Sequence, residues 1–199
     1  MSSRRGQEVK YIKDKDLGKI REYLARKDKI VFLAFVNIGV NVGLRISDLG
    51  RLKFEEINPD FSLYIQERKT GKKRCIVLNS RCKEENKKLK IYYKELGYST
   101  STGYILKSLS PYYLKSKTDA PYVTNGVAKH FKKIREALSI NYPLGSHSLR
   151  KTWGRMVYQG TKDIGLLMKA FGHSSAEQTL KYIGIEEEDI RKIYHDIVV

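Results

Sequence analysis

The sequence predicts a mainly α-helical protein with one small antiparallel β-hairpin, an α+β fold. Apolar residues recur at helical spacing along most of the 199 residues. Only two short segments alternate apolar with polar residues, and a glycine-containing turn separates them. A hydrophobic content of 41% is enough for a core, and 11% aromatic residues argue against a disordered chain. We expect a flexible N-terminus over residues 1–10 and a single domain over residues 11–199, with residues 185–199 forming a C-terminal helix or tail.

Two helices are predicted before the hairpin. Apolar side chains at helical spacing predict a first helix over about Asp14–Arg26. The apolar run Ile30–Leu44 predicts a second, mostly buried helix, because it is too short to cross a bilayer and carries two asparagines. Gly43 ends this helix, and Ser47 is expected to cap the short helix that follows.

The two alternating segments lie on either side of the sequence KTGKK, which supplies a turn. The first contains Phe61, Leu63 and Ile65, and the second contains Cys75 and Val77. This pattern predicts a basic β-hairpin in which Cys75 is a small core residue.

The second half of the chain is predicted to be helical, with one long irregular segment. A basic helix is expected over about Arg81–Leu96, with Gly97 as its stop, and another begins near Val127. Residues 97–123 show no clear period, and a loop of that length is usually functional or mobile. The last third is expected to be helical, with breaks at GSHS, QGTK, FGHSS and IGIEEED.

The charge of the chain favours a polyanionic partner. Lys and Arg number 39 against 22 acidic residues, which gives a net charge of +17. An excess of this size on a folded protein favours nucleic acid over the alternative of a merely well-solvated basic protein. We expect contacts to double-stranded DNA from the hairpin, from the helix after Val127 and from one residue further on: Lys72, Lys73, Arg74, Lys129, Lys132, Lys133 and Lys151.

Nothing in the sequence indicates secretion or a membrane. The basic N-terminal stretch has no apolar core behind it, as a signal peptide would. Cys75 and Cys82 lack metal-ligand spacing with other Cys or His residues. We therefore expect a cytoplasmic, nucleoid-associated protein with no membrane partner and no metal site.

Polar residues gather at three predicted helix starts, where free N–H groups and the helix dipole favour anions. Arg45 lies in GLRISDLGRL, and His147 and Arg150 lie three residues apart in GSHSLRKTW. His173 precedes SSAE, in which Ser174 and Glu177 fit a capping box. Arginine adds a planar fork that grips two phosphate oxygens at once. These segments predict a phosphate site.

Each of these residues taken alone has an ordinary explanation. A lone arginine before a helix is usually solvated, a lone histidine beside a cap is more often structural, and most of the 14 tyrosines pack in the core or lie on the surface. The evidence that these residues form one functional site comes from the order in which they occur: an arginine, a hairpin lysine, His-x-x-Arg, Gly-His and then a tyrosine.

This series resembles the catalytic domain of the tyrosine recombinases, from about Lys10 to the end of the chain. GLRISDLGRLKFEEI resembles the first box of the family, with Asp48 where an acid usually braces it. HSLRKTW and FGHSS resemble the segments that follow, and TLKYIGI carries the tyrosine. The resemblance places the catalytic residues at Arg45, Lys69, His147, Arg150, His173 and Tyr182, with Lys72 and Lys73 close enough to compete with Lys69.

The resemblance implies that the protein cleaves and rejoins DNA at specific sites. Tyr182 would attack the phosphodiester and become a 3′-phosphotyrosine, while Arg45 and Arg150 clamp the phosphate. Lys69 would be the general acid, His147 a general acid/base and His173 a donor to a phosphate oxygen. Because the covalent link conserves the energy of the phosphodiester, no ATP, metal or other cofactor is expected. A phenol has a reference pKa of about 10, so the attack needs a base or compensating charge.

Several alternatives stay open. The same residues suit a type IB topoisomerase, and the same fold suits a DNA-binding regulator without catalysis. Only 44 residues precede Arg45, so the chain is either a domain of a longer integrase or one of the short recombinases such as the fimbrial inverters. The resemblance implies a synaptic tetramer on DNA and allows a monomer without DNA. The C-terminal tail packs on its own domain or docks on a neighbour, and Lys151 stands where many relatives have histidine.

Overall fold

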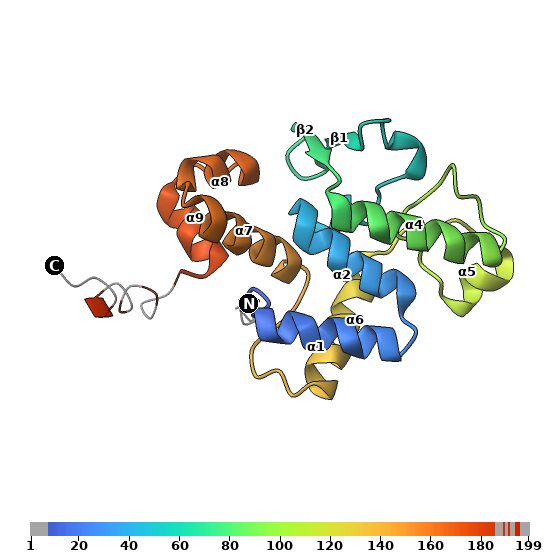
Figure 1. Cartoon of the computed structure of the whole chain (residues 1–199), viewed down its shortest axis with the longest axis horizontal. Helices are drawn as coiled ribbons and strands as arrows, with labels where there is room; N and C mark the ends of the chain where they lie inside the picture. Colours follow the sequence, from blue (N-terminus) through green and yellow to red (C-terminus); the bar gives the residue numbers. More distant parts are fainter. Residues whose placement is uncertain (1–7, 186–188, 190, 192–193, 196–199) are drawn as a thin grey trace, which may run out of the picture.

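A computed structural model describes residues 8–185, 189, 191, 194 and 195 of the chain. Helices dominate this part of the chain, and the two strands form a single antiparallel pair (Figure 1). The elements in order are α1 (Asp14–Arg26), α2 (Ile30–Val42), α3 (Ile46–Leu49), the 3-10 helix η1 (Phe54–Glu56), β1 (Ser62–Gln66), β2 (Lys73–Val77), α4 (Ser80–Glu95), α5 (Pro111–Ser116), α6 (Thr124–Ala137), α7 (Ser148–Thr161), α8 (Ile164–Phe171) and α9 (Ala176–Ile183). The prediction of a mainly helical α+β fold is confirmed.

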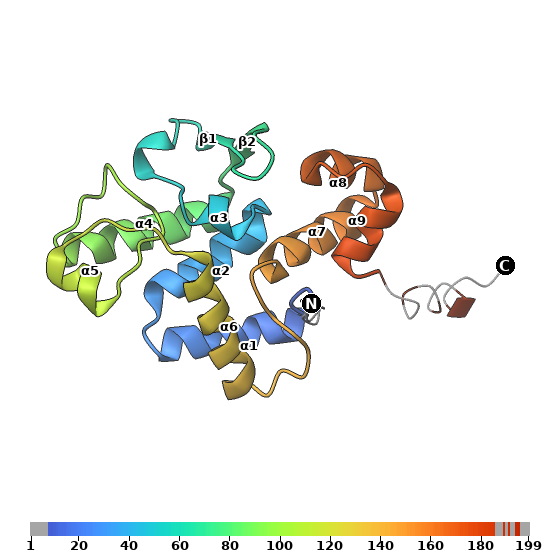
Figure 2. The same cartoon turned by 180° about the vertical axis from the view of Figure 1, so that it is seen from behind.

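Helix α2 forms the centre of the main core. Nearly all of its residues are apolar, so it is buried on every side and packs against α1, α4 and α7 (Figures 1 and 2). Phe32 and Phe35 stack with ring centroids 5.7 Å apart, and Phe131 of α6 meets Phe32 edge-on. Gly43 ends the helix, as predicted, and its backbone is in the left-handed conformation.

Helices α7, α8 and α9 gather at one end of the molecule around a second, smaller apolar cluster (Figures 1 and 2). Its buried members are Leu167, Phe171 and Ile183. Gly154 of α7 allows the close approach, because a Cβ there would lie 2.5 Å from the Phe171 ring and 2.9 Å from Ile183. The last two helices are thus seated on α7, which carries the His-x-x-Arg segment at its start.

The predicted hairpin is present, but the inward face of its second strand differs from expectation. Leu63 pairs with Ile76, and both are buried, whereas Val77 is 63% exposed. Cys75 is exposed, so the expectation that it belongs to the core is wrong. The core face of β2 is set by Ile76, with Leu78 just beyond the strand, since strand side chains alternate between faces.

Two predicted caps are displaced by one or two residues. The N-cap of α3 is Arg45 and no side chain caps that helix, so the role expected for Ser47 is wrong. The N-cap of α9 is Ser175, whose hydroxyl accepts from the backbone N–H of Gln178 at 3.1 Å. The capping box expected of Ser174 and Glu177 is therefore wrong as well.

The segment 97–123 is more ordered than expected. It contains α5 and two isolated bridges, which pair Lys53 with Tyr104 and Lys107 with Pro121. The buried hydroxyl of Tyr93 donates to the carbonyl of Ile105 at 3.0 Å and so ties the segment to α4. Helical spacing did not predict this order because tertiary contacts supply it.

The segment before α1 is held in place. The N–H of Lys10 donates to the carbonyl of Pro143, and the N–H of Ile12 donates to Thr152 Oγ1 at 2.8 Å. The N-terminus predicted to be flexible, residues 1–10, overlaps this segment at residues 8–10, and residues 1–7 lie outside the described residues. Most of the predicted tail, 185–199, also lies outside them. Among the described residues, no helix combines the length and apolar character that a membrane span needs.

Candidate active site

Arg150 is fixed at the start of α7, where the helix meets α2 and α8. Its Nη1 donates to the carbonyl of Gly43 at 2.8 Å, and its Nη2 donates to the carbonyl of Phe171 at 3.3 Å. The residue is 2% exposed, and burial lowers the pKa of its guanidinium to about 10. It remains charged at neutral pH, so it presents a desolvated positive charge that water does not screen.

Arg45 and Arg150 contact one and the same carboxylate. Arg45 Nη1 lies 2.6 Å from Oε2 of Glu67, and Arg150 Nη1 lies 3.8 Å from Oε1. Arg74 Nη1 also reaches Oε1, at 3.0 Å. Burial alone would raise the pKa of Glu67, but hydrogen bonds from Thr70, Arg74 and Arg45 outweigh burial and lower it to about 2. The two arginines of the predicted phosphate site are thus close enough to share one anion.

Tyr182 of α9 lies beside these arginines and bonds to His147. The distance from Tyr182 Oη to His147 Nδ1 is 3.1 Å, and the phenol ring packs on the rings of Phe171 and His173. Burial raises the pKa of Tyr182, while the charges of Arg150 and Arg45 oppose that rise. The hydroxyl is therefore protonated at neutral pH and lies beside the two arginines.

Both histidines are kept neutral at neutral pH. Partial desolvation, and then the charges of Arg150 and Lys151, lower the pKa of His147. Desolvation and Arg150 likewise lower the pKa of His173. His147 can therefore accept the proton of Tyr182.

The ring of His173 is oriented by α9. Its Nδ1 lies 3.1 Å from Thr179 Oγ1, a hydroxyl that already donates to the carbonyl of Ser175. Thr179 must then accept from Nδ1, which leaves Nε2 of the neutral ring without a proton. His173 can donate to an anion through Nε2 only in its charged form.

The turn of the hairpin brings its lysines toward the same site. Lys69 is exposed, and its charge contributes to the lowered pKa of His147. Lys72 Nζ lies 3.4 Å from the point where a Cβ on Gly172 would be, next to His173. In Figure 1 the hairpin and α8 lie along the same edge of the molecule. Two turn lysines are thus within reach of the site.

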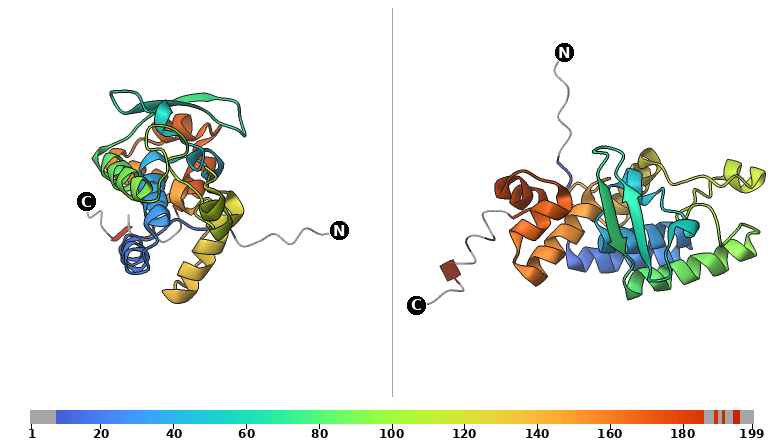
Figure 3. Two further views of the ribbon diagram at one scale, coloured as in Figure 1. Left: turned by 90° about the vertical axis from the view of Figure 1, so that its right-hand side faces the viewer. Right: turned by 90° about the horizontal axis from the view of Figure 1, so that it is seen from above.

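The residues expected to contact DNA differ in how far they are exposed to solvent. Lys72, Lys73, Lys129, Lys132 and Lys133 are exposed. Figure 3 (left) shows the hairpin at one edge and α6, which carries the last three, reaching the opposite edge. Arg74 is half-buried on Glu67.

The structure does not support a DNA contact for Lys151. Its side chain is 7% exposed, and its ammonium lies 2.7 Å from Oε1 of Glu8 and 5.1 Å from the centre of the Tyr182 ring. The charge is thus used inside the protein, against the ring of the tyrosine, and the N-terminal segment supplies its counter-ion. No local pattern indicated this pairing, because 143 residues separate the partners.

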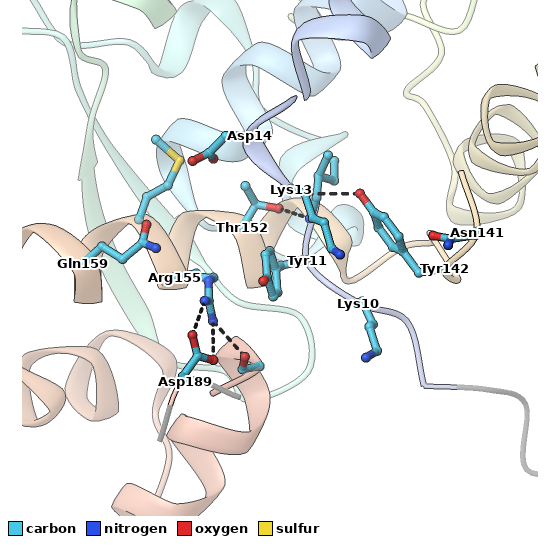
Figure 4. A pocket seen from close by; sticks show the side chains of 13 residues that line it. Lys10, Tyr11, Lys13, Asp14, Asn141, Tyr142, Thr152, Arg155, Gln159 and Asp189 are labelled. Carbon is cyan, nitrogen blue, oxygen red and sulfur yellow. Dashed lines mark hydrogen bonds and ion pairs between the residues drawn. The ribbon is translucent and has the colours of Figure 1, made fainter. Parts of the chain in front are cut away.

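Arg155, one turn further along α7, fixes the end of the tyrosine helix. It donates to the carbonyl of Gly184 at 2.8 Å, pairs with Asp189 at 2.9 Å, and lies over the ring of Tyr11 (Figure 4). The cavity drawn there, of about 500 Å³, is lined by none of the six predicted catalytic residues.

Within the described residues, no three His, Cys, Asp or Glu side chains are grouped closely enough to hold a metal ion.

Glu67 is the site residue that the sequence did not single out. Asp48 was expected to brace the first box, and its Oδ1 accepts from the backbone N–H of Arg68 at 3.2 Å. The carboxylate on Arg45 belongs to Glu67. A signal was present in the sequence, because Glu67 is the one acid in the otherwise basic stretch ERKTGKKR. A buried acid needs cationic partners, and this stretch supplies them.

The described geometry defines a helical scaffold with an anion site made of two arginines beside a histidine-bonded tyrosine. A sequence model of the phage integrase family matches residues 10–188, and the chain belongs to this family. The chain is 33% identical over 175 residues to the probable integrase/recombinase YoeC of Bacillus subtilis, a match that covers 88% of each protein. It is 29% identical to the tyrosine recombinase XerC of Caldanaerobacter subterraneus over 80% of this chain and 42% of XerC.

The fold is that of tyrosine recombinase catalytic domains. The crystal structure of XerA recombinase superposes with a TM-score of 0.72 at 17% identity, covering 98% of this chain and 66% of that one. A lambda integrase tetramer bound to a Holliday junction superposes with a TM-score of 0.67 at 22% identity, covering 93% of this chain and 52% of that one. The chain thus spans between half and two thirds of these solved proteins.

Proposed function

We propose that this protein is a site-specific DNA recombinase that cleaves and rejoins strands through a 3′-phosphotyrosine on Tyr182. The observation that carries the proposal is the pair of arginines on one carboxylate, Arg45 at 2.6 Å and Arg150 at 3.8 Å. An anion held between them lies beside a tyrosine that already has a hydrogen-bonded base, His147 at 3.1 Å. Family membership supports the same reaction.

The proposed cleavage step balances without a co-reactant. Tyr182 Oη attacks the phosphorus while its proton passes to Nδ1 of His147. The bond from phosphorus to O5′ breaks, and O5′ takes its electron pair together with a proton from a lysine of the hairpin turn. Arg45 and Arg150 neutralise the nonbridging oxygens as charge develops on them. The negative charge of a bound phosphate favours the protonated form of His173, which then adds a donor. In rejoining, a 5′-hydroxyl attacks the phosphotyrosine and the protons return.

The proposed partner is double-stranded DNA, bound by a synaptic tetramer inside the cell at the nucleoid. Support comes from the net charge of +17 and from the lambda integrase tetramer on a Holliday junction, which this chain resembles in fold. Strand exchange between two duplexes is favoured over relaxation by a topoisomerase, because the curated relatives are integrases and recombinases.

A selection experiment tests this function and identifies the target sequence at the same time. Duplexes with a randomised centre and a nick near it are incubated with the protein, and species that survive detergent are recovered and sequenced. The nick lets the short strand diffuse away, which traps the covalent intermediate. We expect a recovered, enriched sequence for the natural chain and none for Tyr182→Phe. Tight DNA binding with no adduct from the natural chain would instead favour the regulator.

A further inference from the structure

Glu67 is the most unusual group near the site, because it is an acid buried among cations where a phosphate is expected. The residue is 3% exposed and has three guanidinium groups within 4 Å, those of Arg45, Arg74 and Arg150. Three positive charges this close repel one another strongly when they are shielded from water. One buried carboxylate between them offsets much of that repulsion and, through short charge-assisted bonds, fixes where Arg45 and Arg74 point.

The same carboxylate is tied to the turn that carries Lys69. Thr70 Oγ1 donates to Glu67 Oε2 at 2.7 Å. The backbone closes around it, since the Glu67 N–H donates to the Lys72 carbonyl and the Gly71 N–H donates to the Glu67 carbonyl. Asp48 holds the next residue, because it accepts from the Arg68 N–H. A displacement of the turn therefore moves Glu67, and with it Arg45.

We propose that Glu67 is a positioning residue that holds Arg45 in the geometry needed for phosphate and couples it to the turn carrying Lys69. This inference rests on the proposed function. It also predicts opposite effects of one substitution on DNA binding and on cleavage. Loss of the Glu67 charge leaves the pocket more positive, so DNA binding is kept or strengthened. Cleavage falls, because Arg45 is no longer aimed at the phosphate.

The test compares Glu67→Gln with Glu22→Gln. Both raise the net charge by one, but Glu22 is 70% exposed and pairs with Arg26 on the surface of α1. On DNA from the selection, at saturation, we expect Glu67→Gln to form the adduct at least tenfold more slowly with DNA affinity equal or higher. Glu67→Asp keeps the charge and should recover part of the rate. Glu22→Gln should match the natural chain in both measurements.

Two outcomes would overturn the inference. The first is an adduct rate for Glu67→Gln equal to that of the natural chain. The second is a loss of affinity and rate by the same factor in Glu67→Gln and Glu67→Asp, which would make Glu67 a merely structural residue.

A measurement on the natural chain covers the case in which the variants fail to fold. In nitrogen NMR of the guanidinium groups, Arg45 should show slow rotation and resolved Nη signals, while Arg26, 77% exposed, should show averaged signals. Averaged signals from Arg45 would contradict the inference. Because this readout needs no cleavage, it judges the role of Glu67 even if the natural chain forms no adduct and the proposed function fails.

Discussion

At the scale of single residues, the site depends on groups whose charge is set by burial. In the proposed mechanism His147 accepts the proton of Tyr182 only while its ring is neutral, and partial desolvation together with Arg150 lowers the pKa of His147. The sequence pointed to Arg45, His147, Arg150 and His173 because their motifs lie at predicted helix starts. Lys69 and Tyr182 were predicted from the family resemblance instead. The sequence did not indicate the Glu8–Lys151 pair, because side chains that the fold brings together from 143 residues apart leave no local pattern. For Glu67 the sign was its place as the one acid in ERKTGKKR.

The pH dependence of cleavage follows from His147. A lowered pKa means that the neutral, accepting ring persists below pH 6.5, and activity is lost as pH falls through that lowered pKa. With DNA below saturation, the rate of adduct formation reports the DNA-free protein. We expect this rate to fall on the acidic side of the pH profile with a midpoint under pH 6.5. The variant His173→Gln should retain this acidic fall in rate. A midpoint above pH 6.5, or an unchanged acidic fall in rate in His147→Gln, would show that another group is the base.

The choice between Lys69 and Lys72 as general acid is open to a chemical test. A substrate with sulfur in place of the bridging 5′-oxygen has a leaving group that needs no proton. The variant lacking the acid should therefore cleave ordinary DNA slowly and sulfur-substituted DNA at the rate of the natural chain. Lys69→Met is expected to show this rescue, and Lys72→Met serves as its matched neighbour. Rescue of Lys72→Met alone would transfer the role to Lys72.

At the scale of elements, the helices were predicted well because their apolar periods are long and several of them, such as α2, α8 and α9, end at a glycine. Helix α1 has the predicted bounds, and α2 begins at Ile30 and ends at Gly43, inside the apolar run Ile30–Leu44. The short elements were harder, since β2 turns Cys75 outward and the caps of α3 and α9 shift. In a five-residue strand, a single buried position determines which face points to the core, and tertiary contacts determine which position that is.

Gly43 joins two elements of the site, because its left-handed backbone turns a carbonyl toward Arg150. A Cβ there would lie 2.2 Å from the Trp153 ring. We expect Gly43→Ala to lower the free energy of unfolding by more than the roughly 1–2 kcal/mol of the left-handed conformation alone, and to slow cleavage. Urea unfolding measures the first effect.

Gly18 provides the control for this substitution. It lies inside α1, and a Cβ added there would have nothing within 4 Å, so Gly18→Ala should stabilise by about 0.5–1 kcal/mol. If Gly43→Ala were as stable as Gly18→Ala, the packing of α2 on α7 would not be as described.

At the scale of the whole molecule, we propose that the exposed lysines of the hairpin and of α6 contact DNA. Replacing Lys129, Lys132 and Lys133 with Gln should reduce the slope of log affinity against log salt by about 0.9 for each lost phosphate contact. The matched control replaces three exposed lysines on or next to α1, which carries no site residue: Lys15, Lys19 and Lys27. Binding titrations over a range of salt give both slopes. Equal slopes in the two triple variants would exclude α6 from the DNA interface.

The central claim is that residues distant in sequence form one phosphate site with Tyr182 aimed at it. Mass spectrometry of the trypsin-digested covalent adduct tests this claim most directly. Trypsin separates Tyr182, in the peptide Tyr182–Arg191, from Tyr194, which is 82% exposed and lies in the peptide after Lys192. We predict the nucleotide mass on the peptide Tyr182–Arg191. Its presence on the peptide containing Tyr194, or on any other tyrosine, would contradict the claim.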